Sequence, residues 1–211
     1  MDSINGLTLI GLTGPSGAGK AVVASVFAER GIPSVDTDAV YHTLLEPPSP
    51  CLDALREAFS NAIIRPDGTL DRPALSALVF EPTPQGKERH SRLNDITHRF
   101  ILQRSQELLC QYAADGAKIA ILDAPLLIEA GLASVCDHVI AVLADRDLRF
   151  RRLTERDGRS GQQINARLNA QPDDDFYRRH ADFVIENNGS PEALRSAVQA
   201  ICSRLEDPTC K

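Results

Sequence analysis

The chain has 211 residues, of which 43% are hydrophobic and 25% charged, and its net charge is −6 at pH 7. These values suit one globular domain, and the acidic balance argues against a nucleic-acid partner, which usually requires a basic face. The five cysteines include no C-x-x-C pair, so we expect neither a disulfide framework nor a zinc site. No stretch has the length and apolarity of a membrane span or a signal peptide, so we expect a cytoplasmic protein without a membrane partner.

Short apolar runs alternate with amphipathic segments along the chain. The runs predict strands at 7–13, 32–35, 118–123, 138–143 and 183–185. Apolar spacing of three and four residues predicts helices at 21–30, 40–59 with a break at 46–50, 73–80, 84–114, 146–155, 162–170 and 191–205. This alternation indicates an α/β fold with a parallel sheet, and the mostly helical stretch 39–115 is predicted to be an inserted lobe.

A glycine-rich segment, GPSGAGKA, follows the first predicted strand and opens the first predicted helix. It fits the phosphate-loop pattern G-x-x-x-x-G-K-[ST] at every position except the last. The glycines let backbone N–H groups converge on a phosphate, and the helix adds the positive end of its dipole. The residues predicted to bind the nucleotide in this loop are Gly14, Ser16, Gly17, Ala18, Gly19, Lys20 and Ala21.

Ala21 stands where the pattern has a serine or threonine hydroxyl, which normally binds Mg²⁺. Because magnesium often keeps several waters and takes few protein ligands, the loss of this hydroxyl does not by itself abolish nucleotide binding. We therefore expect ATP to bind here, with a metal site that lacks one of its usual ligands.

Two carboxylates, Asp36 and Asp38, come directly after the second predicted strand. In open α/β sheets, ligands bind at the carboxyl ends of the strands, and the phosphate loop is expected at the same edge. Asp36 fits both a helix N-cap and a functional role, whereas Asp38 fits a functional role better.

Several separated segments together resemble the dephospho-coenzyme A kinase family, whose members use ATP to phosphorylate the ribose 3′-hydroxyl of dephospho-CoA. The DGTLDR and PLLIE sequences are the most specific part of this resemblance, because phosphate loops occur in many families. The segments that carry it are IGLTGPSGAGKA (10–21), VDTDAV (35–40), DGTLDR (67–72), LDAPLLIEAGL (122–132), RRLTERD (151–157), RLNAQ (167–171) and ADFVIENNGS (181–190).

The resemblance implies a P-loop NTPase-type three-layer fold with a parallel sheet, in which residues 1–211 form one kinase domain. It implies a helical substrate lobe at about 39–115, a lid at about 149–178, and ATP and Mg²⁺ as cofactors. Asp38 is expected to accept the proton of the attacking hydroxyl, and Lys20 to neutralise phosphate charge. Asp38 and Asp123 are the expected metal ligands, and Asp123 ends the third predicted strand.

The resemblance also assigns phosphate contacts to Arg152 and Arg156, which lie four residues apart on one helix face. The alternative for each is a solvated surface arginine. The expected substrate-binding residues are Asp36, Arg72, His98, Leu126 and Glu129. Arg72 fits either a structural pair with Asp71 or a contact with the acidic coenzyme, and His98 fits either a structural or a substrate-binding role.

The sequence departs from the family pattern at a few other positions. His42 and Tyr41 occupy a place where the family tends to have Ala-Arg, Arg99 follows His98 in place of proline, and Arg149 replaces a frequent glutamine. Two alternative functions remain: a non-catalytic or weakened nucleotide- or CoA-binding homologue, and a nucleoside monophosphate kinase of the same architecture. The sequence leaves the oligomeric state open.

Overall fold

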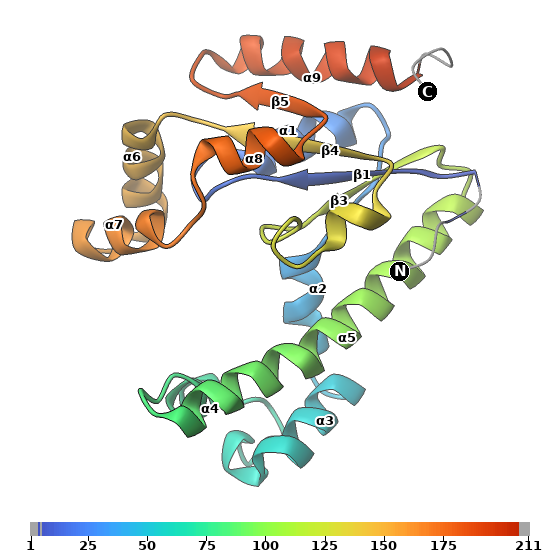
Figure 1. Ribbon diagram of the computed structural model, residues 1–211. Coiled ribbons are helices and arrows are strands. Elements are labelled where there is room, and N and C mark those ends of the chain that lie inside the picture. Colours follow the sequence, from blue (N-terminus) through green and yellow to red (C-terminus); the bar gives the residue numbers. More distant parts are fainter. Residues whose placement is uncertain (1–3, 5, 207–211) are drawn as a thin grey trace. The chain divides into compact units, whose positions relative to one another are not determined.

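The computed structural model describes residue 4 and residues 6–206 (Figure 1). The chain divides into two compact units. We call Asp36–Gln111 the helical unit, and the rest of the described chain on either side of it the sheet unit. Each unit is described by itself. Cys210 lies outside the described residues, and the four described cysteines are not in disulfides.

The sheet unit is built on five parallel strands in the order β2-β3-β1-β4-β5. The strands are β1 (Thr8–Thr13), β2 (Ser34–Asp36), β3 (Ile119–Asp123), β4 (His138–Leu143) and β5 (Phe183–Glu186). β1 pairs in parallel with β3 on one side and with β4 on the other, so the strand that enters the glycine-rich loop is central. The predicted α/β class with a parallel sheet is confirmed.

Helices cover both faces of this sheet (Figure 1). α1 and α9 pack on one face, where Phe27 and Val198 contact a fully buried layer from β1, β3 and β4. α8 packs on the other face through Tyr177, against Ala141 and Leu143 of β4. The helices of the sheet unit are α1 (Lys20–Glu29), α6 (Arg146–Asp157), α7 (Gly161–Asn169), α8 (Asp174–His180) and α9 (Pro191–Glu206), with the short 3₁₀ helix η2 (Leu132–Val135).

The sequence explains why the strands form where they do. Ile10 and Leu12 of β1 and Ile140 and Val142 of β4 are buried, as expected for strands covered on both faces. Each of these side chains contributes roughly 1.5–3 kcal/mol on burial. The strands thereby hold the loops at their carboxyl ends in fixed register, and Figure 1 shows α6 and α7 beyond those ends.

The helical unit contains a core of its own. Leu55, Ile63 and Leu75 are buried there, and Leu93 and Phe100 of the long helix pack against them. The elements of this unit are α2 (Thr37–Leu44), α3 (Pro50–Phe59), the 3₁₀ helix η1 (Asn61–Ile63), α4 (Arg72–Val79) and α5 (Pro84–Ala114), whose last residues belong to the sheet unit.

The predicted break of the helical unit is present, and a tight turn precedes α4. α2 and α3 are separate helices, because Ser49 caps α3 with its hydroxyl and Pro50 occupies the first helical turn. The turn before α4 is closed by Asp67, whose Oδ1 accepts hydrogen bonds from N and Oγ1 of Thr69 at 2.9 and 2.7 Å. Gly68 has φ +84°, a conformation that glycine adopts without strain.

Candidate active site

The glycine-rich loop between β1 and α1 has the shape of a phosphate cradle. Gly14, Gly17 and Gly19 have φ values of +138°, +80° and +101°. A β-carbon on Gly14 would collide with the carbonyl of Val142, and one on Gly19 with the side chain of Asn187. Glycine is therefore required by the backbone conformation and by the close approach of neighbouring elements. This geometry fits the phosphates of a nucleotide.

The amino-terminal end of α1 lies directly behind this loop. The helix begins at Lys20, and its first turn holds no acidic residue, so the positive end of its dipole is not offset there. The Nζ of Lys20 donates to the carbonyl oxygen of Gly14 at 3.0 Å, across the mouth of the loop. A half-buried ammonium group and a helix end together favour an anion at this place.

Two residues far along the chain hold the outer side of the loop. The buried Asn187, just after β5, donates from Nδ2 to the carbonyl oxygen of Ala18 at 2.8 Å. Arg152 of α6 donates to the carbonyl oxygens of Gly17 and Ala18 at 3.3 Å, and to that of Asn187 at 3.1 Å. Burial and the nearby charge of Arg151 lower the pKa of Arg152. Arg152 therefore lies against the loop, and its phosphate contact stays a prediction.

The predicted lid also reaches the loop, through residues absent from the predicted set. The backbone N of Ser16 donates to Oε1 of Gln171 at 2.9 Å, and the Nε of Arg167 donates to Ser16 Oγ at 3.0 Å. Arg156 instead pairs with Asp157, with Nε 2.6 Å from Oδ1. This hydrogen bond holds the pKa of Asp157 below its usual range. Arg156 thus contacts a carboxylate on its own helix.

The segment after β3 places the other predicted residues of the sheet unit. Asp123 is the last residue of β3 and is half-buried. Leu126 has 56% of its surface exposed, which is unusual for a large apolar side chain, and Glu129 is also exposed. The acidic charge of Glu129 acts on Tyr177, whose pKa is raised to about 12 by burial first and by Glu129 second.

In the helical unit, Asp36 is the N-cap of α2. Its Oδ1 accepts from the backbone N of Asp38 at 2.9 Å and from that of Ala39 at 3.1 Å. This supports the structural alternative for Asp36. Asp38 lies in the first turn of α2 and is exposed, so its carboxylate is accessible.

Arg72 and Asp71 make separate contacts. Asp71 caps α4, with Oδ1 accepting from the backbone N of Ala74 at 3.0 Å. The Nη2 of Arg72 lies 3.2 Å from Nδ1 of His42. The last residue of the DGTLDR segment therefore contacts α2, the helix that carries Asp38. The exposed His98 lies on α5.

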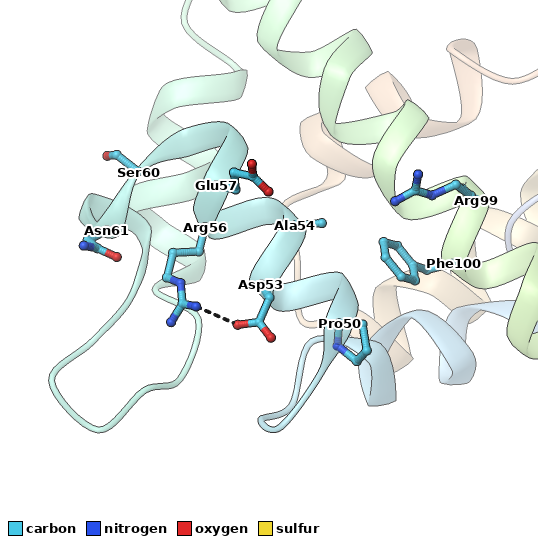
Figure 2. Close-up of a pocket in the computed structure, with 9 residues that line it drawn as sticks. All are labelled: Pro50, Asp53, Ala54, Arg56, Glu57, Ser60, Asn61, Arg99 and Phe100. Carbon is cyan, nitrogen blue, oxygen red and sulfur yellow. Dashed lines mark ion pairs between the residues drawn. The ribbon is translucent and has the colours of Figure 1, made fainter.

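A groove of about 780 Å³ lies within the helical unit, between α3 and α5. Figure 2 shows Arg99 and Phe100 of α5 on one side and the side chains of α3 on the other. The guanidinium of Arg99 stacks on the Phe100 ring, 4.8 Å from its centroid. The groove is lined by Pro50, Asp53, Ala54, Arg56, Glu57, Ser60, Asn61, Arg99 and Phe100. Its two acidic and two basic residues balance, which suits an uncharged polar ligand.

The described residues hold no group of three or more histidine, cysteine or acidic side chains that could bind a metal ion. The expected ligands Asp38 and Asp123 belong to different units. Both supply the oxygen donors that magnesium prefers, and Ala21 supplies none. In residue type, each carboxylate fits a Mg²⁺ ion that keeps several of its waters, and the metal site stays a prediction. Within the described part of the chain, no helix is long and apolar enough to cross a membrane.

The central β1, the glycine cradle and the lysine at the start of α1 define a nucleotide-binding kinase of the P-loop class. A model of the dephospho-CoA kinase family matches residues 8–192, and the chain belongs to this family. The dephospho-CoA kinase of Anaeromyxobacter dehalogenans is 41% identical over 94% of this chain and 92% of its own length. That of Corynebacterium glutamicum is 38% identical over 93% and 96%.

Solved structures agree with the fold. TT1252 from Thermus thermophilus is 32% identical, with a TM-score of 0.78 over 95% of this chain and 98% of that chain. The dephospho-CoA kinase from Campylobacter jejuni is 22% identical, with a TM-score of 0.64 over 95% and 98%, and this likeness supports the fold alone. The predicted P-loop fold and kinase family are confirmed.

Proposed function

We propose that this chain transfers the γ-phosphoryl group of ATP to the 3′-hydroxyl of dephospho-CoA, which yields ADP and coenzyme A. The observation that carries the proposal is the glycine cradle in front of α1, in a chain of the dephospho-CoA kinase family. Phosphoryl transfer needs little covalent chemistry from a protein, so the residues act mainly by positioning the reactants and neutralising charge.

Asp38 is the proposed general base. Its exposed carboxylate lies in the first turn of α2, whose N-cap Asp36 fixes the backbone at that point. A carboxylate in this position can accept the proton of the attacking hydroxyl. We assign Asp36 a supporting role, since its Oδ1 accepts two hydrogen bonds from the backbone of α2.

Lys20 and Arg152 are proposed to stabilise the charge on the phosphates. Lys20 already lies across the loop and Arg152 on its outer side. Arg156 joins them only if it exchanges Asp157 for a phosphate, which charge-assisted hydrogen bonding makes possible. The segment of about 149–178 would act as the lid in this scheme.

Magnesium is the proposed metal, held by Asp38 and Asp123 together with water and the nucleotide. The ion supplies positive charge that offsets the charge of the phosphate oxygens. Because Ala21 offers no oxygen, we expect this chain to need more magnesium than a variant that carries a hydroxyl at this position.

The helical unit is proposed to bind dephospho-CoA. The guanidinium of Arg72 pairs with no carboxylate among the described residues and is exposed, so it suits the pyrophosphate of the substrate. His98 is the second proposed contact in this unit, and Leu126 and Glu129 are proposed contacts from the sheet unit. The groove between α3 and α5 suits the uncharged pantetheine arm, which carries amide groups and a thiol.

One observation favours a second candidate, a binding protein with weak or no turnover. Ala21 removes a metal ligand from an otherwise complete loop. We favour the enzyme, because Lys20, Asp38 and Arg152 all remain. The cytoplasm, with its pool of ATP, is the proposed site of the reaction, and neither a nucleic acid nor a membrane is proposed as a partner.

The experiment is a product analysis with the purified chain, ATP, magnesium and dephospho-CoA. We expect one ADP for each coenzyme A formed, with the new phosphate on the ribose 3′-oxygen by phosphorus NMR. We expect an Asp38→Asn variant to fold and to bind ATP, because Asp38 is exposed, but to form neither product above background. Phosphate on another position, or ADP formed without coenzyme A, would overturn the proposal.

A further inference from the structure

Arg149, on α6 in the sheet unit, is a buried charged residue outside the glycine-rich loop. Its side chain keeps 9% of its surface exposed, and Nη2 lies 3.6 Å from Oδ1 of Asp174 on α8. A guanidinium cannot lose its proton at ordinary pH, so its charge must be balanced where it is buried. Asp174 supplies that balance and joins α6 to α8.

Tyr177 and Glu129 complete a charged cluster around Arg149. Tyr177 is fully buried on α8, one helical turn after Asp174. Burial first and the negative charge of Glu129 second raise the pKa of Tyr177 to about 12, while the positive charge of Arg149 opposes both. We call Arg149, Asp174, Tyr177 and Glu129 the Arg149 cluster. It brings together three separate segments: the chain after β3, α6 and α8.

The cluster is poorly arranged for stability alone. Arg149 Nε and Asp174 Oδ1 are buried and have no hydrogen-bond partner among the described residues. A buried polar group without a hydrogen bond costs free energy, and apolar side chains of similar volume stabilise a fold at least as well as a buried ion pair does. The cluster therefore points to a role in fixing one arrangement of α6 and α8.

The backbone of Arg149 also packs on the glycine-rich loop. A β-carbon on Gly17 would lie 2.9 Å from the carbonyl oxygen of Arg149 and 3.1 Å from its α-carbon. Three residues further along α6, Arg152 donates to the carbonyl oxygens of Gly17 and Ala18. A rotation or shift of α6 would therefore displace both the packing contact and the hydrogen bonds that hold the loop.

We propose that Arg149 is a positioning residue for the ATP site: its ion pair with Asp174 fixes α6 against Gly17 and so keeps Arg152 on the loop carbonyls. Arg149 does not touch the reacting groups in this scheme and acts through Arg152. Only the activity readout of this inference rests on the proposed function, because ATP binding can be measured without an acceptor substrate.

The test is a double-mutant cycle read as the Kd of a fluorescent ATP analogue. Arg149→Met, which removes the charge but keeps a long side chain, should weaken binding about tenfold, within the range measured for coupled side chains. Asp174→Asn should also weaken it, since it leaves the buried charge unpaired. The double variant should bind more tightly than the product of the two single effects predicts. Arg149→Lys should recover most of the affinity.

The matched control is Arg151→Met, which removes the same charge from an exposed position of α6. It should change the Kd by less than about twofold, as surface substitutions usually do. Steady-state kinetics should show that Arg149→Met raises the KM for ATP and leaves the KM for dephospho-CoA within about twofold, because the affected contacts belong to the loop.

Two outcomes would overturn the inference. The first is wild-type ATP affinity in Arg149→Met, whether or not its melting temperature falls. The second is a double variant in which the two single effects on the Kd simply multiply. If Arg149→Met does not fold, Asp174→Asn and Arg149→Lys still test the pair, and wild-type affinity in Asp174→Asn counts against it. A wild-type chain that binds ATP but does not phosphorylate dephospho-CoA would refute the proposed function and leave the cycle interpretable.

Discussion

Asn187 offers the sharpest test of how the loop is held. Its buried Nδ2 donates to the carbonyl oxygen of Ala18 at 2.8 Å, and Arg152 Nη1 donates to the same oxygen at 3.3 Å. Asn187→Ala removes the shorter of the two hydrogen bonds and leaves a small void. The lost hydrogen bond contributes about 0.5–1.5 kcal/mol, and with the void we expect the free energy of unfolding to fall by about 1–3 kcal/mol.

The loss should also reach the nucleotide. If about 1–2 kcal/mol of the loop's preorganisation is lost, the Kd for ATP rises by roughly 5–30-fold. Isothermal titration with a non-hydrolysable ATP analogue measures this, and a chain of this size should lose about 2–4 °C in melting temperature for each kcal/mol.

Asn188→Ala is the control for this prediction. Asn188 is exposed and makes two hydrogen bonds with Asp145. Asn188 Nδ2 donates to Asp145 Oδ1 at 2.9 Å, and the backbone N of Asp145 donates to Asn188 Oδ1 at 2.7 Å. It contacts α6 at its N-cap and not the loop. We expect its Kd for ATP to stay within about twofold of the wild type. Equal ATP affinity in Asn187→Ala and the wild type, despite lower stability, would refute the reasoning.

Further variants separate the roles of the two units and test the buried thiols. Asp38→Asn should lower kcat by about 10²–10⁴-fold with unchanged ATP affinity, measured by ADP release and titration; normal turnover would exclude the base. Arg72→Met should raise the KM for dephospho-CoA by about tenfold with little change in the KM for ATP, and a KM change for ATP alone would contradict it. Burial raises the pKa of Cys51 to about 11 and of Cys136 to about 12, so at pH 8 a thiol reagent should label the exposed Cys110 before these two, as measured by peptide mapping. In the unfolded chain these thiols lose their protons near pH 9, whereas in the folded chain Cys51 and Cys136 keep theirs. The urea concentration at the midpoint of unfolding should therefore fall as the pH rises from 9 towards 12.

Local chemistry made most of the elements predictable from the sequence. The apolar runs placed every strand within about two residues, and Pro73 marked a helix start to within one residue. α8 was missed, because its seven residues, DDFYRRH, have too short an apolar pattern to stand out. Only the tertiary contact of Tyr177 with β4 gives this helix an apolar face.

The candidate site was predictable where spacing alone defines it. The glycines and Lys20 of the loop follow from one contiguous motif, and a single helical turn relates Arg152 to Arg156. The contacts of Asn187 and Gln171 were not predictable, since they join residues more than 150 positions apart. The place of a residue in the sequence cannot show that its side-chain amide reaches a carbonyl oxygen or an N–H group of the loop.

Two ambiguous positions needed coordinates. Asp36 caps α2 in the structure, whereas the sequence pattern fits a cap and a substrate contact equally well. Asp71 and Arg72 are neighbours that do not pair with each other, because the carboxylate turns to the backbone of α4 and the guanidinium to His42. Side-chain direction at a helix start, and not residue type, decided both.

The most direct test of the central claim compares the natural chain with Ala21→Ser. ADP formation from ATP is measured with and without dephospho-CoA, across a magnesium titration. The account predicts that both proteins turn over only when dephospho-CoA is present, and that the serine variant reaches half of its maximal rate at a lower magnesium concentration. Turnover in the serine variant alone would mean that the natural chain is a binding protein with a disabled metal site. No substrate-dependent turnover in either would contradict the kinase assignment itself.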